Sequence, residues 1–226
     1  IHARLGVFPW RQVVGPADAL ARFNFKRSLA FVADWQAATP VDPVARAVFG
    51  GQNSVGAPLE QLDLAALLSQ IRVQGGGSVY SGAAARLIWQ AATEAGYGID
   101  QDAWRKTLPA AGEPITRQIG SHIMVTLPFQ TAHSSAAGNA DSSLVAVDGK
   151  GNAVGCVFSM GRPFGSGRLI GGVFFPAPGT PVGAPVLVTN PNTKILLAAL
   201  VGGRNRDAIE GLANTALRGG VPLGQA

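Results

Sequence analysis

Hydrophobic residues in the first 108 positions recur at the spacing of helix faces. In the segment that begins at Pro9, apolar residues three and four positions apart indicate one face of an α-helix, and Pro16 inside it predicts a break or kink. Three glycines from Gly75 are a typical helix stop. Further helices are expected over residues 25–38, 42–49, 62–74 and 79–96, the last capped by Ser78, and a short helix capped by Asp100 runs to Trp104.

After Pro109 the pattern changes to short β-branched runs separated by turn residues. Gly120-Ser121 predicts one hairpin, and the run 148–152, DGKGN, closes a second, because glycine accepts the positive φ that such turns require. The predicted strands cover residues 115–119, 122–127, 144–147, 153–160, 169–175, 185–189 and 195–201, and a helix over 205–217 follows. Helices first and antiparallel strands later predict an α+β fold. We expect a single domain, residues 1–226, with a mainly helical part (1–108) and a mainly strand part with a C-terminal helix (109–226).

Composition narrows the classes of partner. Hydrophobic residues make up 47% of the 226, which predicts a packed core, and charged residues only 14%, below the usual quarter. A surface so poor in charge hints at burial against a protein partner, and a surface of small alanines and glycines explains it equally well. The net charge is +5, but the lysines and arginines are scattered with no basic run, so nucleic-acid binding is not expected.

Metal and cofactor chemistry finds no support in the sequence. The histidines His2, His122 and His133 have no partners at metal-ligand spacing, and the single cysteine, Cys156, is interpreted as a small buried hydrophobe. No phosphate-binding glycine motif occurs, so no cofactor is expected. No apolar run is long enough for a transmembrane segment. Because the chain begins at Ile1, we expect either that a signal peptide and more have been removed or that the sequence is incomplete.

The candidate functional residues lie mainly in the stretch 141–172 and at one later glycine pair. Gly165-Ser166-Gly167 lies in a loop too rich in glycine and proline to be regular. Gly202-Gly203 follows an apolar strand and opens a helix, where free backbone N–H groups can bind an anion or oxyanion, although a tight strand-to-helix turn explains the pair as well. The adjacent pair His133-Ser134 is a poor nucleophile and base, because neighbouring residues rarely face each other.

Several segments, in one order, resemble the γ-glutamyltranspeptidase family of N-terminal nucleophile hydrolases. The hairpin SSLVAVDGKGNAVG (142–155), the loop FGSG (164–167) and LLAALVGG (196–203) are similar to the start of the family's small subunit, its Phe-Gly-Ser-Gly loop and its Gly-Gly turn. Upstream, FPWRQVVGPADALA (8–21), residues 62–91 and EPITRQIGSHIMVTLP (113–128) resemble its large subunit. The resemblance implies an αββα sandwich, and a periplasmic or extracellular location.

In that family an autocatalytic cut frees a threonine whose hydroxyl is the nucleophile and whose own α-amine is the base. The register fixed by VAVDGKGNAV puts Asp141 at this position and Ser142 one residue later. A carboxylate cannot replace the hydroxyl in self-cleavage, so the cut between Ala140 and Asp141 should fail. A shift by one residue would let Ser142 serve, but such a slip turns the strand's side chains to the opposite face.

Other family features are also missing, and together they predict an inactive protein. Gly161 stands where the resemblance places a substrate-binding Asn, Val182-Gly183 replaces a pair of serines, and the carboxylate-binding arginine belongs upstream of Ile1. The glycine pair Gly202-Gly203 matches the family's oxyanion hole. We therefore expect a structural or accessory subunit of a larger assembly, with a vestigial γ-glutamyl pocket formed by Gly165, Ser166, Gly202 and Gly203. The alternatives are a divergent amidohydrolase or transferase that uses Ser142 after processing, and a small-molecule binding module.

Overall fold

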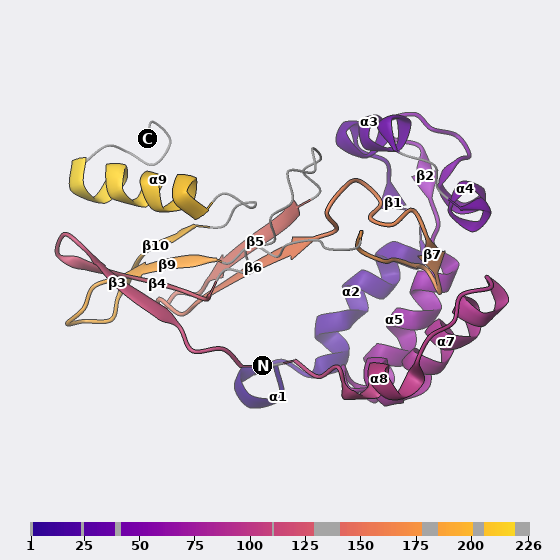
Figure 1. Cartoon of the computed structure of the whole chain (residues 1–226), viewed down its shortest axis with the longest axis horizontal. Helices are drawn as coiled ribbons and strands as arrows, with labels where there is room; N and C mark the ends of the chain where they lie inside the picture. Colours follow the sequence, from indigo (N-terminus) through magenta and orange to yellow (C-terminus); the bar gives the residue numbers. More distant parts are fainter. Residues whose placement is uncertain are drawn as a thin grey trace. The chain divides into compact units, whose positions relative to one another are not determined.

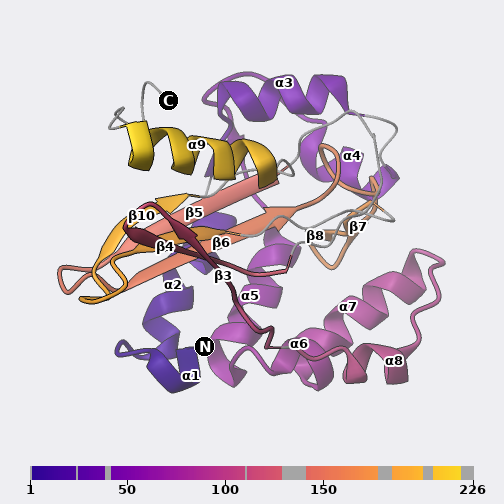
Figure 2. The same ribbon diagram turned by 60° about the vertical axis from the view of Figure 1, so that its left-hand side comes forward.

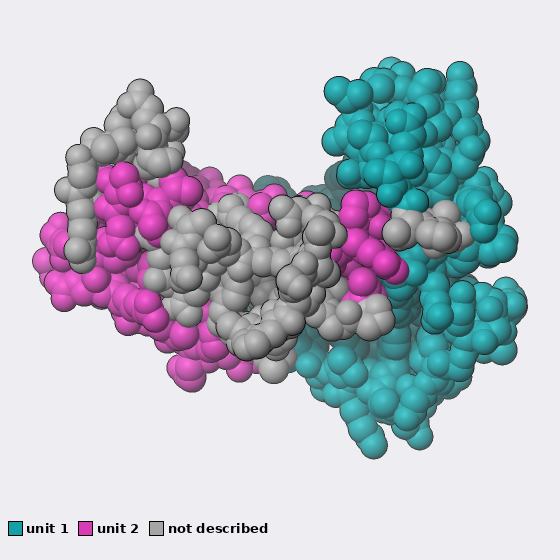
Figure 3. Space-filling view, turned by 45° about the horizontal axis from the view of Figure 1, so that its top comes forward, with its two compact units in different colours: residues 1–109, 166–175 teal, residues 110–165, 176–226 magenta. Residues whose placement is uncertain are grey.

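The computed structural model describes residues 2–23, 25–38, 42–109, 111–128, 141–177, 185–200 and 206–219. The chain forms two compact units, shown in different colours in Figure 3. Unit 1 contains residues 1–109 and 166–175, and unit 2 contains residues 110–165 and 176–226. The single-domain organisation stays a prediction.

Unit 1 consists of helices with two short antiparallel ladders (Figure 1). The ladders pair β1 (Phe25–Lys26) with β2 (Pro58–Leu59), and β7 (Leu169–Ile170) with β8 (Val173–Phe174). The helices are α1 (His2–Leu5), α2 (Trp10–Arg22), α3 (Leu29–Ala37), α4 (Pro43–Phe49), α5 (Leu62–Gln74), α6 (Ser78–Ser81), α7 (Ala83–Glu94) and α8 (Gln101–Lys106).

Two helix predictions were wrong in detail, and a third had left a break and a kink open. Helix α2 continues through Pro16 without a break, because this residue lies on the exposed side, where water can bind the carbonyl group that loses its partner. Residues 25–26 pair as a strand, so α3 begins only after Ser28, whose Oγ accepts a hydrogen bond from Phe31 N at 3.1 Å. The helix expected from 79 to 96 is divided at Gly82, which has extended backbone between α6 and α7. Ser78 is not its cap, because it is the first residue of α6 and its Oγ donates to Gly75 O at 2.7 Å instead.

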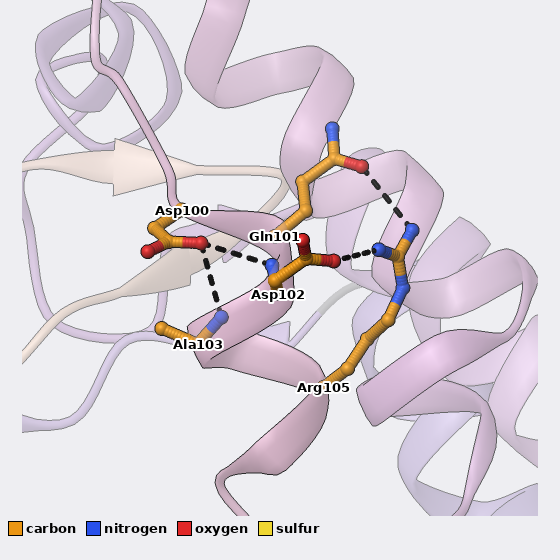
Figure 4. A network of polar contacts seen from close by, with 5 residues as sticks. All are labelled: Asp100, Gln101, Asp102, Ala103 and Arg105. Atoms are coloured by element: carbon orange, nitrogen blue, oxygen red, sulfur yellow. Dashed lines mark hydrogen bonds and ion pairs between the residues drawn. The ribbon is translucent and has the colours of Figure 1, made fainter.

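Local signals placed the ends of other helices correctly. Helix α5 ends at Gln74, and Gly75 follows with a φ of 84°. At α8, Oδ1 of Asp100 accepts hydrogen bonds from the backbone N–H groups of Asp102 and Ala103, both at 3.0 Å (Figure 4). Within the same helix Arg105 forms an ion pair with Asp102 at 2.8 Å. These caps hold a helix of six residues that is too short to be stable alone.

The core of unit 1 joins the helices to the β7–β8 hairpin. Helices α2 and α5 pack side by side, and Trp10 Nε1 donates a hydrogen bond to Ile71 O at 2.7 Å. Asp18 is buried on α2 and forms ion pairs with Arg22 and Arg72 at 3.0 and 3.4 Å. One buried apolar cluster of this unit contains Leu67, Ala84, Ile88, Ala92 and Ile170. Segment 166–175 therefore completes the core formed by the first 109 residues.

Unit 2 is built on an antiparallel sheet of strand order β10-β9-β4-β3. Helix α9 (Arg206–Gly219) lies over one face of it (Figures 1 and 2), and Ala213 packs there against Met124, Val186 and Val188. The strands of this sheet are β3 (Ile115–Ile119), β4 (His122–Thr126), β9 (Val186–Thr189) and β10 (Leu196–Leu200). A separate hairpin pairs β5 (Asp141–Val147) with β6 (Ala153–Ser159), and β6 contacts β10. The mixed helix and strand composition predicted from the sequence is confirmed.

Candidate functional site

The β5–β6 hairpin carries the two candidate nucleophile positions, and its register is continuous. Asp141 pairs with Ser159 and Ser142 with Phe158, and the ladder runs without a bulge to Val147 opposite Ala153. Successive residues of a strand point to opposite faces of a sheet. A one-residue shift that brings Ser142 to the place of Asp141 would therefore turn the other side chains of the strand to the opposite face.

A hydrogen-bonded turn fixes this register. The Asp148 carboxylate accepts hydrogen bonds from Lys150 N at 2.8 Å, from Asn152 N at 2.9 Å and from Asn152 Nδ2 at 2.7 Å. Gly151 supplies the positive φ, 82°, that the turn needs. The hydrogen bond from the Asn152 side chain, followed by those from backbone N–H groups, lowers the pKa of Asp148. A slip by one residue would have to break this set of bonds.

Ser142 lies on the more exposed face of the hairpin. On the same face are Leu144, Val154 and Phe158, which are 47%, 49% and 55% exposed, and Cys156, which is half-buried rather than fully buried as expected. The Ser142 hydroxyl has no side-chain hydrogen-bond partner among the described residues. A serine without a base or an orienting group is a weak nucleophile.

The loop after β6 has the special backbone that its glycines predict. Positive φ angles occur at Gly161 (79°), Phe164 (58°), Gly165 (56°) and Gly167 (77°). Gly165 is buried, its N–H donates to Arg162 O at 2.9 Å, and its carbonyl accepts from Arg162 Nε at 2.7 Å. A bulky residue such as Phe164 adopts positive φ only when its surroundings impose it. The loop is therefore held in one strained conformation.

Ser166 begins the segment that belongs to unit 1. Its N–H donates to Phe175 O at 2.8 Å, while its Oγ is buried and has no hydrogen-bond partner in the described part of the chain. A buried hydroxyl without a partner is costly, so such a group in a native fold needs an explanation. A ligand or a water molecule that hydrogen-bonds to this Oγ would provide one.

Asp42 holds this segment to helix α4. Its Oδ1 accepts from Ala45 N at 2.7 Å as the cap of α4, and its Oδ2 accepts from Leu169 N at 3.0 Å. Its own N–H donates to Gly167 O at 3.0 Å. The sequence indicated only that a helix begins here; the contacts 125 and more residues away left no local signal.

The remaining candidates are only partly described. Gly202, Gly203, His133, Ser134 and Val182-Gly183 lie outside the described residues, as does the side chain of Asp141. Among the residues that are described, no group of histidine, cysteine and acidic side chains is arranged to hold a metal ion. Nor does any helix in the described ranges have the length and hydropathy to cross a membrane.

Comparisons with known proteins give a family match and a fold match. The family model described as "Gamma-glutamyltranspeptidase" matches residues 1–140. The structure of cephalosporin acylase from Bacillus halodurans superimposes with a TM-score of 0.74 at 15% identity, over 95% of this chain and 60% of that one. This second match concerns the fold alone.

Two further solved structures match over shorter stretches. The transpeptidase CapD from Bacillus anthracis has 23% identity and a TM-score of 0.49, over 56% of this chain and 45% of that one. The γ-glutamyltranspeptidase from Pseudomonas nitroreducens, complexed with L-DON, has 23% identity and a TM-score of 0.48, over 58% and 40%. The chain thus spans about half the length of the solved structures it matches. The comparison with curated protein sequences gave no match.

Proposed function

The chain belongs to the gamma-glutamyltranspeptidase family, and we propose that it is a catalytically inactive member that serves as a structural or accessory subunit of a larger assembly. The observation that carries this proposal is the continuous β5–β6 register, in which strand β5 starts with Asp141. The match to the family model ends at residue 140, directly before that strand.

The chemistry at the start of β5 supports inactivity. Self-cleavage and acyl transfer at this position require an alcohol or thiol that attacks a carbonyl carbon, and a carboxylate is no substitute in the self-cleavage step. Ser142 is the nearest hydroxyl, but it pairs with Phe158 one position further along an unbroken ladder, so its use would require a one-residue shift of the strand. We therefore expect the peptide bond before Asp141 to stay intact, and the αββα sandwich to be kept in one uncut chain.

An exposed apolar face on the hairpin supports an accessory role. Leu144, Val154 and Phe158 lie together on it, about half exposed each, and a sheet face of this kind in a soluble protein is typical of an interaction site. A protein partner with an apolar surface would cover it. By family membership we propose that this occurs in the periplasm or outside the cell.

A vestigial pocket is the second part of the proposal. The resemblance to the family implies that Gly165, Ser166, Gly202 and Gly203 form it, with backbone N–H groups as donors; of these, Gly165 has the positive φ of a special loop. Without a nucleophile such groups can bind a γ-glutamyl compound but cannot turn it over.

Intact-mass measurement of the purified protein tests the proposal directly. We expect one species of 23.2 kDa and no chromophore release from a γ-glutamyl anilide. The variant S142A should behave identically, because Ser142 has no role. Two fragments separated before Asp141 or Ser142, with turnover that S142A abolishes, would instead establish the divergent amidohydrolase or transferase.

A further inference from the structure

A cavity of about 560 Å³ lies within unit 1. Its walls come from Arg27 directly after β1, from β2, from the end of α4 and the loop after it, from the first turn of α5, and from Leu169 and Gly172 of the β7–β8 hairpin. This volume is in the range of small-molecule sites.

One wall carries a buried arginine that lacks a full set of partners. Arg27 is 3% exposed, and burial lowers its pKa. Within the described ranges its guanidinium donates one hydrogen bond, from Nη1 to Phe49 O at 2.7 Å, and lies over the Phe31 ring at 5.3 Å, while Nε has no partner. Buried arginines are normally paired with an acid, since an isolated buried charge is costly. Because Arg27 lines the cavity, its positive charge favours an anionic ligand group there.

The N-terminus of helix α5 lies in the same wall and adds to the positive potential. Gln61 precedes this helix of 13 residues and makes no side-chain hydrogen bond to its first turn. Leu62 and Leu64 of that turn line the cavity. Free N–H groups and the helix dipole attract an anion to such a position. Arg27 and the start of α5 therefore favour the same kind of ligand group.

Two carboxylates line the cavity on its solvent side. Glu60 and Asp63 are both exposed, whereas Arg27 is buried, so the acids lie nearer the mouth. They would repel a simple anion and attract an amine. The cavity thus has a positive interior and a negative mouth.

From this charge arrangement we propose that the cavity binds a small amino carboxylate, with its carboxylate against Arg27 and the N-terminus of α5 and its ammonium group at Glu60 and Asp63. This site is independent of the proposed lack of catalysis. It lies in the helical unit and needs no cut in the chain.

Calorimetric titration of the whole protein tests the proposal. The probes are glycine, β-alanine and 4-aminobutyrate, which vary the distance between amine and carboxylate, with acetate, ethylamine and inorganic phosphate for comparison. One amino carboxylate should bind at a single site about tenfold more tightly than acetate, because a hydrogen bond to a charged group contributes about that factor. The double variant E60Q/D63N should remove this preference and leave acetate binding no weaker.

The matched control is E113Q, which neutralises an exposed acid of unit 2 and should change nothing. R27K keeps the charge but loses the planar fork, so all carboxylates should bind more weakly; its circular dichroism melt shows whether it is folded. The proposal is overturned if no amino carboxylate binds saturably, if phosphate binds as tightly as the best of them, or if E60Q/D63N leaves the preference intact.

Discussion

Removal of the Asp42 carboxylate should destabilise unit 1 more than the loss of an ordinary helix cap. The variant D42A loses the hydrogen bond to Ala45 N that caps α4, which contributes about 1 kcal/mol. It also loses the bond from Leu169 N, a half-buried hydrogen bond to a charged group that contributes about 1.5 kcal/mol. The expected loss in the free energy of unfolding is therefore ~2.5 kcal/mol.

Two variants separate the two contributions. D100A removes the exposed cap of α8, with two hydrogen bonds at 3.0 Å but no distant partner, and should cost about 1 kcal/mol. D42N keeps a side-chain oxygen for the cap and places one acceptor fewer near Leu169, so its cost should lie between those of D42A and D100A.

Tryptophan fluorescence during urea unfolding measures these differences in unit 1 alone, because all four tryptophans lie in its first 109 residues. The reasoning is refuted if D42A costs no more than D100A. The bond to Leu169 would then contribute nothing, and segment 166–175 would be held by its apolar contacts only.

Two more predictions concern backbone and charge. Gly172→Ala should lower the free energy of unfolding by more than about 2 kcal/mol, because Gly172 has a φ of 80° and a Cβ there would clash with the backbone N of Leu64. Gly151→Ala should cost only about 1 kcal/mol, because Gly151 has a similar φ of 82° but open space around it. Urea titration measures the first change by fluorescence of unit 1 and the second by circular dichroism. Because the pKa of Asp148 is lowered, its ionised form stabilises the hairpin at neutral pH, and this contribution is lost as the pH falls through the pKa of the folded state. The amide chemical shift of Asn152 should therefore titrate below the ordinary carboxyl range. Titration at or above that range would contradict the turn geometry.

Local signals in the sequence were sufficient wherever the cause of a structure lies within a few residues. The cap at Asp100, the stop at Gly75 and the turn at 148–152 depend on hydrogen bonds to residues two to four positions away, or on one positive φ. Pro16 left a break and a kink open, because the sequence does not reveal that its side of α2 faces solvent, where a missing hydrogen bond matters less.

Long-range features could not be predicted in the same way. Asp42 and Leu169 are 127 positions apart, and nothing near either residue indicates their contact. Arg27 follows Lys26 and resembles a surface charge in the sequence, yet it is buried beside Phe31 and Phe49. In the candidate site, the positive φ at Gly165 agrees with its expected role in a special loop, whereas the buried Oγ of Ser166 follows from packing alone.

The discontinuity of unit 1 constrains the order in which the protein folds. Ile170 belongs to the same buried cluster as Leu67 and Ile88, so the helices cannot close their core until residue 170 has left the ribosome. During synthesis of the intervening strands, the first 109 residues expose apolar surface, which is the state most prone to aggregation. A helical fragment expressed without residues 166–175 should therefore behave as an open, poorly soluble intermediate.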